Sequence, residues 1–329
     1  MSDAERAALP PADAASHAHG RRGARSTPII SCRNVVKRYP GKTVLSGVTF
    51  DVYPGEVMVV MGNSGCGKST LLRTLIGSIK PDEGEILLFG QDIAKLDEEG
   101  LNEVRKRFGI LFQSGALFNS LTVGENVALP MLEHTDLDPA IIDLSVRAKL
   151  AMVRLEEAID RTPSQLSGGM KKRAGLARAL ALDPELLFYD EPSAGLDPVV
   201  SAQIDQLIAQ LCKQLNTTSV VVTHEMDSAF TIADRMMMLH QGRVLKIETR
   251  AWYERLRNLS EDEASGLPET ERLIRQFIRG SHKGPLTEGD GKSAALEKFF
   301  GLEAERPAIL ATPSVESTRN RTRTFSLKP

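Results

Sequence analysis

A glycine-rich stretch, Gly62–Ser69, has the spacing G-x-x-x-x-G-K-[ST], which can bind phosphate groups. It stands between an apolar strand expected over Val57–Met61 and a helix expected over Lys68–Ile79. Glycines let the backbone direct its N–H groups at phosphate oxygens, and the helix presents its positive end to the same anion. Lys68 would then reach the terminal phosphates, and Ser69 would bind Mg²⁺. The flanking strand and helix disfavour the alternative, a glycine turn without a ligand.

A second apolar stretch, Leu186–Tyr189, ends in two carboxylates, Asp190 and Glu191. Ligands of open α/β sheets bind at the carboxyl ends of the strands, so these side chains would lie beside the phosphate loop. Asp190 would hold Mg²⁺ directly or through water, and Glu191 would polarise an attacking water as a general base. A strand followed by an acidic turn is also common without any such role, so this assignment depends on the motifs around it.

Leu-Ser-Gly-Gly-Met at residues 166–170 resembles the signature of the ABC ATPases, and other motifs of that family stand in the family's order. Gln113 is at the position of the Q-loop glutamine, and Ser193–Asp197 resembles the D-loop. His224 matches the switch histidine, and Tyr39 is placed like the aromatic residue that stacks on adenine. Each residue taken alone is more often structural, but their joint order favours the functional interpretation.

The resemblance covers roughly residues 29–248 and implies both a fold and a site. The implied fold class is α/β: a P-loop NTPase with a RecA-like core, an antiparallel β subdomain and a helical subdomain that carries the signature. The implied cofactors are ATP and Mg²⁺, the implied catalytic residues are Glu191, His224 and Gln113, and the implied metal ligands are Ser69, Gln113 and Asp190. The implied nucleotide contacts are Tyr39, Gly62, Asn63, Ser64, Gly65, Cys66, Gly67, Lys68, Ser69, Thr70, Ser167, Gly168, Gly169 and Asp197.

The signature also implies a partner. Ser167, Gly168 and Gly169 open a helix expected through Lys171–Leu182, and a helix N-terminus with small residues can bind an anion. In the family this end faces the γ-phosphate held by the other protomer. The resemblance therefore implies a homodimer in which two nucleotides are sandwiched between the chains.

The composition of the 329 residues narrows the class of protein further. A formal net charge of −2 gives no sign of a nucleic-acid partner, and three scattered cysteines suit a reducing cytosol rather than a disulfide or zinc framework. No apolar run approaches the roughly 18 residues that span a bilayer, and residues 1–26 do not read as a secretory signal. We therefore expect transport to require a separate membrane permease, with this chain peripheral on the cytoplasmic face of the inner membrane.

The residues after the signature glycines, Met170–Ala179, depart from the commonest family pattern. With Phe112–Phe118, Asn126–Pro130 and the Gln276–Leu286 stretch, they resemble the ATPases of phospholipid-trafficking systems that work with MCE-domain proteins. The implied partners are a permease and an MCE-domain protein, with room for a small accessory subunit. The alternative is an importer ATPase for amino acids or other polar solutes. A single cassette without a long heptad insertion disfavours a second alternative, an ABC-type ATPase acting on nucleic acid.

The chain is expected to divide into four regions. These are a disordered arm (1–26), the ATPase domain (27–250, with its helical subdomain at about 98–180), a C-terminal helical extension (251–284) and a flexible tail (285–329). Phe118, Leu121, Pro130 and Met131 are candidates for a groove that receives a permease helix. In the tail, Leu296, Phe299 and Phe300 either dock on the partner protomer or belong to a solvated segment.

Overall fold

The computed structural model describes residues 27–282 and 285–288. The expected arm 1–26, nearly all of the expected tail and the docking candidates Leu296, Phe299 and Phe300 lie outside the described residues. The chain separates into one compact unit, residues 1–286, and a second, residues 287–329, of which only the end of α11 is described. The fold below is that of the first unit.

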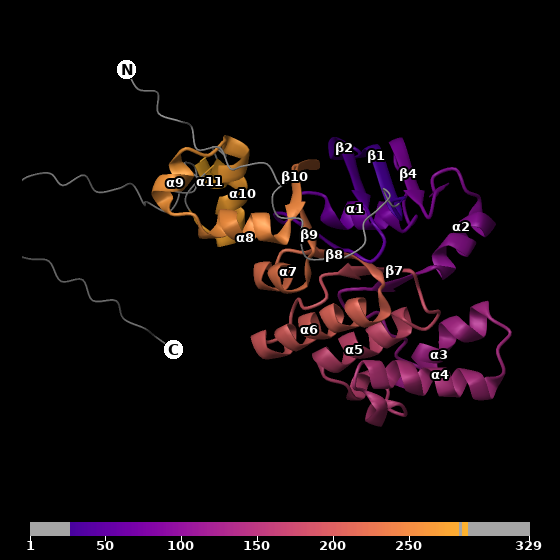
Figure 1. Cartoon of the computed structure of the whole chain (residues 1–329). Coiled ribbons are helices and arrows are strands. Elements are labelled where there is room, and N and C mark those ends of the chain that lie inside the picture. The colour runs from indigo at the N-terminus through magenta and orange to yellow at the C-terminus, as the bar shows by residue number, and fades with distance from the viewer. Residues whose placement is uncertain (1–26, 283–284, 289–329) are drawn as a thin grey trace, which may run out of the picture. The chain divides into compact units, whose positions relative to one another are not determined.

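The first sheet is antiparallel, as the sequence predicts, with the strand order β2-β1-β4-β5. Its strands are β1 (Ile30–Tyr39), β2 (Lys42–Val52), β4 (Glu83–Leu88) and β5 (Gln91–Asp92). Ile30 and Cys32 of β1 pair with both neighbouring strands and are fully buried. Figure 1 shows this sheet above the second one.

The second sheet has six strands in the order β10-β9-β3-β8-β7-β6 and is parallel except for β10. Its strands are β3 (Val57–Met61), β6 (Phe108–Leu111), β7 (Leu186–Asp190), β8 (Thr218–Thr223), β9 (Arg235–His240) and β10 (Arg243–Thr249). All five residues of β3 are buried, and they alternate between two cores. A sheet covered on both faces requires such continuously apolar strands, so the expected parallel α/β core is confirmed.

Helices cover the two faces of this sheet, and each face has its own core. Helix α1 (Lys68–Leu75) and the antiparallel sheet enclose one core, which receives Met58 and Val60 of β3. Helices α5 (Gly168–Ala179), α6 (Pro198–Leu215) and α7 (Met226–Ile232) cover the other face. Helix α1 is shorter than the sequence predicts, because Gly77 beyond its end adopts a left-handed φ of 70°.

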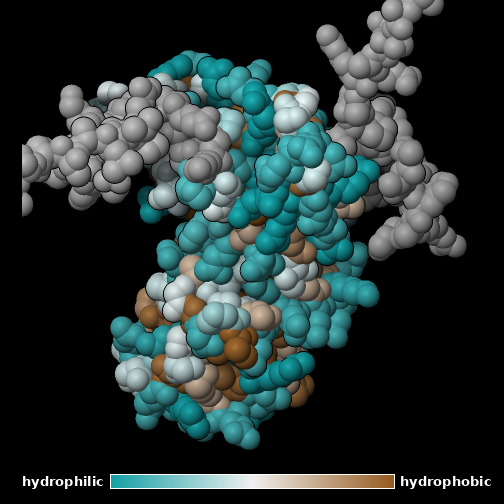
Figure 2. Space-filling model, turned by 90° about the vertical axis from the view of Figure 1, so that its left-hand side faces the viewer, coloured by the Kyte–Doolittle hydropathy of each residue, from teal (hydrophilic) through white to brown (hydrophobic). Residues whose placement is uncertain are grey.

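The region between the two halves of the parallel core is mainly helical, and most of its helices lie at the bottom of Figure 1, with the first, residues 98–106, at the right beside the sheets. It contains α2 (Glu98–Lys106), α3 (Val123–His134) and α4 (Pro139–Met152), together with the short 3₁₀ turns Glu156–Ala158 and Pro163–Gln165. One strand, β6, lies inside this region and pairs with β7 at the edge of the parallel sheet. Figure 2 shows apolar side chains gathered at the level of these helices, whereas the upper part of the same face is mainly hydrophilic.

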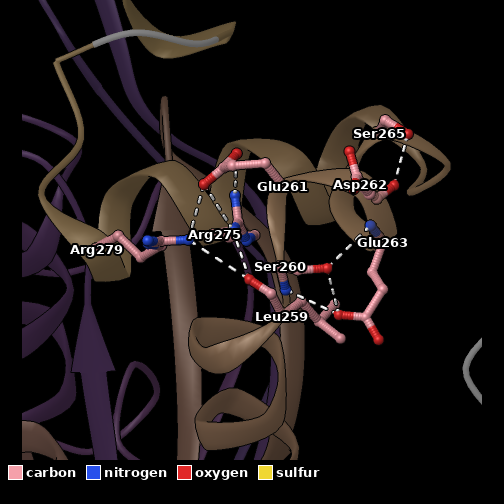
Figure 3. Close-up of polar contacts among 8 residues, drawn as sticks. All are labelled: Leu259, Ser260, Glu261, Asp262, Glu263, Ser265, Arg275 and Arg279. Atoms are coloured by element: carbon pink, nitrogen blue, oxygen red, sulfur yellow. Dashed lines mark hydrogen bonds and ion pairs between the residues drawn. The ribbon is translucent and has the colours of Figure 1, made fainter.

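In the described part of the chain, four helices follow β10: α8 (Arg250–Asn258), α9 (Glu261–Ser265), α10 (Glu269–Arg279) and α11 (Pro285–Glu288). Trp252, Tyr253 and Leu256 bury one side of α8 against the sheet core. Helix α10 is fixed by Arg275, whose Nη2 donates to Glu261 Oε1 at 3.0 Å and to the Leu259 carbonyl at 2.6 Å (Figure 3). No helix among the described residues is long and apolar enough to cross a membrane.

Candidate nucleotide site

A cavity of about 670 Å³ opens where β3, β6, β7 and β8 end. Segments far apart in the sequence meet here because the carboxyl ends of parallel strands share one edge of a sheet. The residues that line the cavity are Lys42, Val44, Gly62, Asn63, Ser64, Gly65, Gly67, Lys68, Ser69, Thr70, Gln113, Asp190, Glu191, His224 and Phe277. Twelve of these fifteen are residues that the sequence assigned to nucleotide, metal or catalysis.

The phosphate loop has a conformation and a close packing that demand glycine. Gly62 has a φ of 157°, and a Cβ there would lie 2.2 Å from the Leu239 carbonyl oxygen. At Gly67 the φ is 113°, and a Cβ would lie 2.9 Å from the Val44 carbonyl oxygen. Any side chain at Gly62 would therefore displace the loop from β9.

Lys68 extends back over this loop. Its Nζ donates to the carbonyl oxygens of Gly62 at 2.6 Å and Asn63 at 3.2 Å, and the residue is only 8% exposed. The ammonium group is thus held at the mouth of the loop, beside the N-terminus of α1. This arrangement places a fixed positive charge and a helix dipole toward the same point of the cavity, which suits a polyphosphate.

Asp190 and Glu191 stand side by side at the end of β7. Burial raises the pKa of Asp190, and the neighbouring Glu191 charge raises it further, while Arg73, Lys172 and Lys68 oppose the shift. A carboxylate that is costly to ionise is a favourable place for a cation. The Ser69 hydroxyl, the Gln113 amide and the Asp190 carboxylate offer the oxygen donors that Mg²⁺ prefers, so these residues fit the ion.

Glu191 and His224 are in direct contact. The His224 Nδ1 lies 2.8 Å from Glu191 Oε1, and the His224 backbone N–H donates to Oε2 at 3.3 Å. Glu191 has a left-handed φ of 49°, and its own N–H donates to the Val222 carbonyl at 2.9 Å. The contact joins the ends of β7 and β8 and aims a largely buried carboxylate at the cavity.

Gln113 follows β6 and lines the cavity from the side of the helical region. The chain immediately after it is tied to α5, because Arg178 donates to the carbonyl oxygens of Gly115 at 3.0 Å and Ala116 at 2.8 Å. Gly115 itself has a φ of 75° and approaches Lys171 closely. A displacement of α5 would therefore be transmitted to the segment that carries Gln113.

The signature residues Ser167, Gly168 and Gly169 and the D-loop residue Asp197 do not line this cavity. Ser167 caps α5 by accepting the Met170 N–H at 3.3 Å, and Asp197 caps α6 through the N–H groups of Val199 and Val200. A Cβ at Gly169 would lie 2.6 Å from Val200 Cγ1, so the two helix starts are packed together. These residues therefore lie together at the N-termini of α5 and α6, outside the cavity lining.

Two further sequence candidates also stand outside the cavity lining. Tyr39 ends β1 with 43% of its surface exposed, and the Lys37 ammonium lies 5.9 Å from its ring centroid. The Cys66 side chain is buried, and burial raises the pKa of its thiol. Only the backbone of this residue is therefore available to the phosphate loop. The stacking of Tyr39 on adenine stays a prediction.

Three residues that line the cavity were not among the sequence candidates. Lys42 and Val44 belong to β2, the strand that packs behind the phosphate loop, and the Gly242 N–H donates to the Cys66 carbonyl at 2.9 Å to complete this support. Phe277 comes from α10, in the layer of helices that follows the sheet. A strand next to the loop motif could have suggested Lys42 and Val44, whereas the place of Phe277 depends on tertiary packing.

Comparison with known proteins shows the family of the chain. A family model described as ABC transporter matches residues 45–194. The "Probable ribonucleotide transport ATP-binding protein mkl" of Mycobacterium leprae is 39% identical over 277 residues, which are 84% of this chain and 76% of that protein. The "Intermembrane phospholipid transport system ATP-binding protein MlaF" is 39% identical in Haemophilus influenzae (78% of this chain, 93% of the relative) and 37% in Escherichia coli K12 (78% and 91%).

Solved structures show the same fold. The cassette MJ0796, in a dimeric post-hydrolysis state bound to ADP and Pi, superposes with a TM-score of 0.63 at 32% identity. The match covers 67% of this chain and 98% of that one. CbiO1 from Clostridium perfringens, part of an ABC transporter complex, gives a TM-score of 0.65 at 29% identity over 75% of this chain and 98% of its own.

The fold and the family define a P-loop ATP hydrolase of the cassette type, with a candidate nucleotide cavity at the edge of its parallel sheet. The chain belongs to the ABC transporter family as an ATP-binding protein, and it resembles both MlaF and mkl.

Proposed function

We propose that this chain powers the movement of phospholipid between membranes as the ATP-hydrolysing subunit of a transporter. The observation that carries the proposal is the match to MlaF, which extends over 259 residues and 93% of that relative, whereas the family model spans only residues 45–194. The match extends well beyond the segment of the family model, and that relative is named as part of an intermembrane phospholipid transport system.

In the proposed reaction, each group of the cavity has a separate task. Lys68 and the N–H groups of the phosphate loop hold the nucleotide, and Glu191 orients water and accepts its proton during attack on the γ-phosphorus. His224 keeps the Glu191 carboxylate in place through the contact between their side chains. The segment after Gln113 communicates the state of the cavity to the helical region.

A magnesium ion bound with the nucleotide would neutralise phosphate charge. We propose Ser69, Gln113 and Asp190 as its protein ligands. Among the described residues, no group of three or more His, Cys, Asp or Glu side chains is arranged to hold a metal. A single carboxylate supplemented by phosphate oxygens is the usual way in which proteins hold Mg²⁺ beside a nucleotide.

We propose that the active form is a homodimer. Ser167, Gly168 and Gly169 are gathered away from the cavity of their own chain, which supports a role at the cavity of a second copy. The structure of MJ0796 was described as dimeric. Asp197, at the start of α6, would lie at the same junction.

The proposed permease site is a groove of about 590 Å³ between α2, α3 and α5. Its lining includes the exposed side chains Phe112 and Phe118, together with Leu129 and Pro130. Leu121 and Met131, two sequence candidates for this groove, are not among its lining residues, and Met131 is instead 2% exposed in the core. An apolar groove of this kind suits a short helix from a membrane protein.

We further propose an MCE-domain protein and a small accessory subunit as partners, with the chain peripheral at the cytoplasmic face of the inner membrane.

The name of mkl supports a second candidate, transport of a polar solute such as a ribonucleotide. Purifying tagged Glu191→Gln protein from its native membrane, with mass spectrometry of associated proteins and lipids, separates the two. Recovery of a permease, an MCE-domain protein and enriched phospholipid is the expected result. Recovery of a permease with a solute-binding protein, without lipid enrichment, would replace the lipid proposal by the second candidate.

A further inference from the structure

A buried lysine stands beneath the two carboxylates of the cavity. Lys172 lies on α5, five positions after the Ser167 cap, and only 5% of its surface is exposed. Its Nζ donates a hydrogen bond to the backbone carbonyl oxygen of Glu191 at 3.0 Å. The side chain thus crosses from the signature helix to the end of β7.

Burial and the neighbouring charges shift the pKa of the Lys172 ammonium in opposite directions. Burial lowers the pKa of its ammonium, while the carboxylates of Glu225, Asp190 and Glu191 favour the charged form. A buried cation is costly unless charges and hydrogen bonds compensate for it. Here compensation comes from three acids on two neighbouring strand ends, so the ammonium is fixed among the groups of the cavity.

The residue that receives this hydrogen bond has an unusual backbone. Glu191 adopts a left-handed φ of 49°. Residues other than glycine rarely adopt this backbone conformation, so the surrounding structure must impose it. Its N–H is held by Val222, and its carboxylate is in contact with His224. The third group, the carbonyl, accepts from Lys172 at 3.0 Å and from the Ala194 N–H at 3.3 Å, and of these partners Lys172 alone comes from α5.

We propose that Lys172 is a positioning residue for ATP hydrolysis: by holding the Glu191 carbonyl, it makes the aim of the Glu191 carboxylate depend on the position of the signature helix. The inference rests on the proposed role of Glu191 and is independent of the transported substrate.

The packing of α5 supports this coupling. At one end Gly169 lies against Val200, and near the other end Arg178 binds the carbonyl oxygens of Gly115 and Ala116. A movement of α5 would therefore reach the cavity by two routes, through the segment after Gln113 and through Lys172. When α5 is out of place, Glu191 loses one of the contacts that hold it in its productive orientation.

The test compares the steady-state ATPase kinetics of the full-length wild type with Lys172→Met, Lys172→Gln and Lys172→Arg. Methionine keeps most of the unbranched side chain without a donor, glutamine keeps a donor without charge, and arginine keeps both. Lys149→Met is the matched control, because Lys149 is 8% exposed and pairs with Asp183 outside the cavity lining. Nucleotide affinity is measured with a fluorescent ATP analogue and folding by thermal melting.

We expect Lys172→Met to lower kcat by at least about tenfold while KM and analogue affinity stay within about twofold, since misplacing a catalytic group costs rate rather than binding. Lys172→Arg should recover most of kcat, and Lys172→Gln should lie between the two. Lys149→Met should lose melting temperature without this loss of kcat. If Lys172→Met proves unfolded, the Lys172→Gln protein carries the test through the same separation of kcat from KM.

The proposal is overturned if the folded Lys172→Met or Lys172→Gln protein hydrolyses ATP at the wild-type kcat. It is also overturned if Lys149→Met loses as much kcat as Lys172→Met, because the loss would then follow from stability alone. Glu191→Gln, measured alongside, separates the two levels of inference. If that variant is inactive while Lys172→Met is fully active, only the positioning role fails; if it is itself active, the proposed role of Glu191 fails first.

Discussion

Glu191 Oε1 lies 2.8 Å from Nδ1 of His224, although the two residues are 33 positions apart in the chain. The contact exists because β7 and β8 are neighbouring parallel strands in register, with Asp190 opposite Val222. The strand order therefore determines which carboxylate and which imidazole share the cavity. It also directs attention to Glu191 as the first residue to change.

Glu191→Gln should keep the shape of the side chain and remove its capacity to accept a proton. We expect kcat to fall by at least about a hundredfold, while affinity for an ATP analogue changes by less than about threefold. Glu185→Gln is the matched control, because Glu185 precedes the opposite end of β7 and pairs with Arg107. A Glu191→Gln protein with wild-type kcat would show that another group activates the water.

Lys68→Ala should act on binding. Removing the ammonium that rests on the phosphate loop takes away a charge-assisted contact to phosphate, so we expect ATP affinity to fall by at least about tenfold. Calorimetric titration with ATP measures this, and Lys80→Ala, at an exposed position beyond α1, serves as the control. Unchanged affinity in Lys68→Ala would remove the phosphate loop from the proposed site.

Ser167→Arg tests whether the cavity is completed by a second chain. Because Ser167 does not line its own cavity, this variant should retain nucleotide binding by the monomer and lose turnover. Mixed with Lys68→Ala protein, it should regain activity, since a mixed dimer contains one intact phosphate loop facing one intact signature. ATPase assays of each variant alone and of mixtures measure the recovery. Mixtures as inactive as the separate variants would argue that both elements must be intact in the same chain.

Asp205 makes a pH-dependent contribution to stability. It lies on α6 with 3% of its surface exposed, where Oδ2 accepts the Ser228 hydroxyl at 2.6 Å, and burial raises the pKa of its carboxyl. A raised pKa in the folded state gives stability that is present below the unfolded value of about 3.9 and is lost as pH rises through the folded value. The melting temperature of Asp205→Asn, measured relative to wild type, should therefore increase from about pH 4 to about pH 7. A difference that stays constant over this range would contradict the prediction.

The sequence predicted the parts of the fold whose signals are local. A few consecutive residues are enough to predict the phosphate loop, the buried strands β3, β7 and β8, and the turn at Gln241 and Gly242. Strand β6 was missed because its four residues follow a helix directly and become a strand only by pairing with β7. The predicted range of helix α1 was too long, because the sequence does not distinguish the left-handed Gly77 from an exposed glycine inside a helix.

The site shows the same division. Motif spacing identified the residues of the phosphate loop, the two carboxylates and His224, and all but Cys66 of these share one cavity. Lys172 could not be found in this way, because a lysine in a run of basic residues usually faces water. Its burial depends on the angle at which α5 crosses the end of β7, and that angle is a property of the packed structure.

The lining of the candidate nucleotide cavity includes Phe277, which lies well after the last ATPase motif in the chain. All of the ATPase motifs end by His224, yet one wall of the candidate nucleotide cavity is an aromatic ring from α10, a helix held down by the Arg275 contacts to Glu261 and Leu259. A shortened cassette that stops after β10 would keep every ATPase motif and lose that wall. Rate constants measured on such a fragment would describe a wider and wetter chamber than the one that α10 helps to enclose.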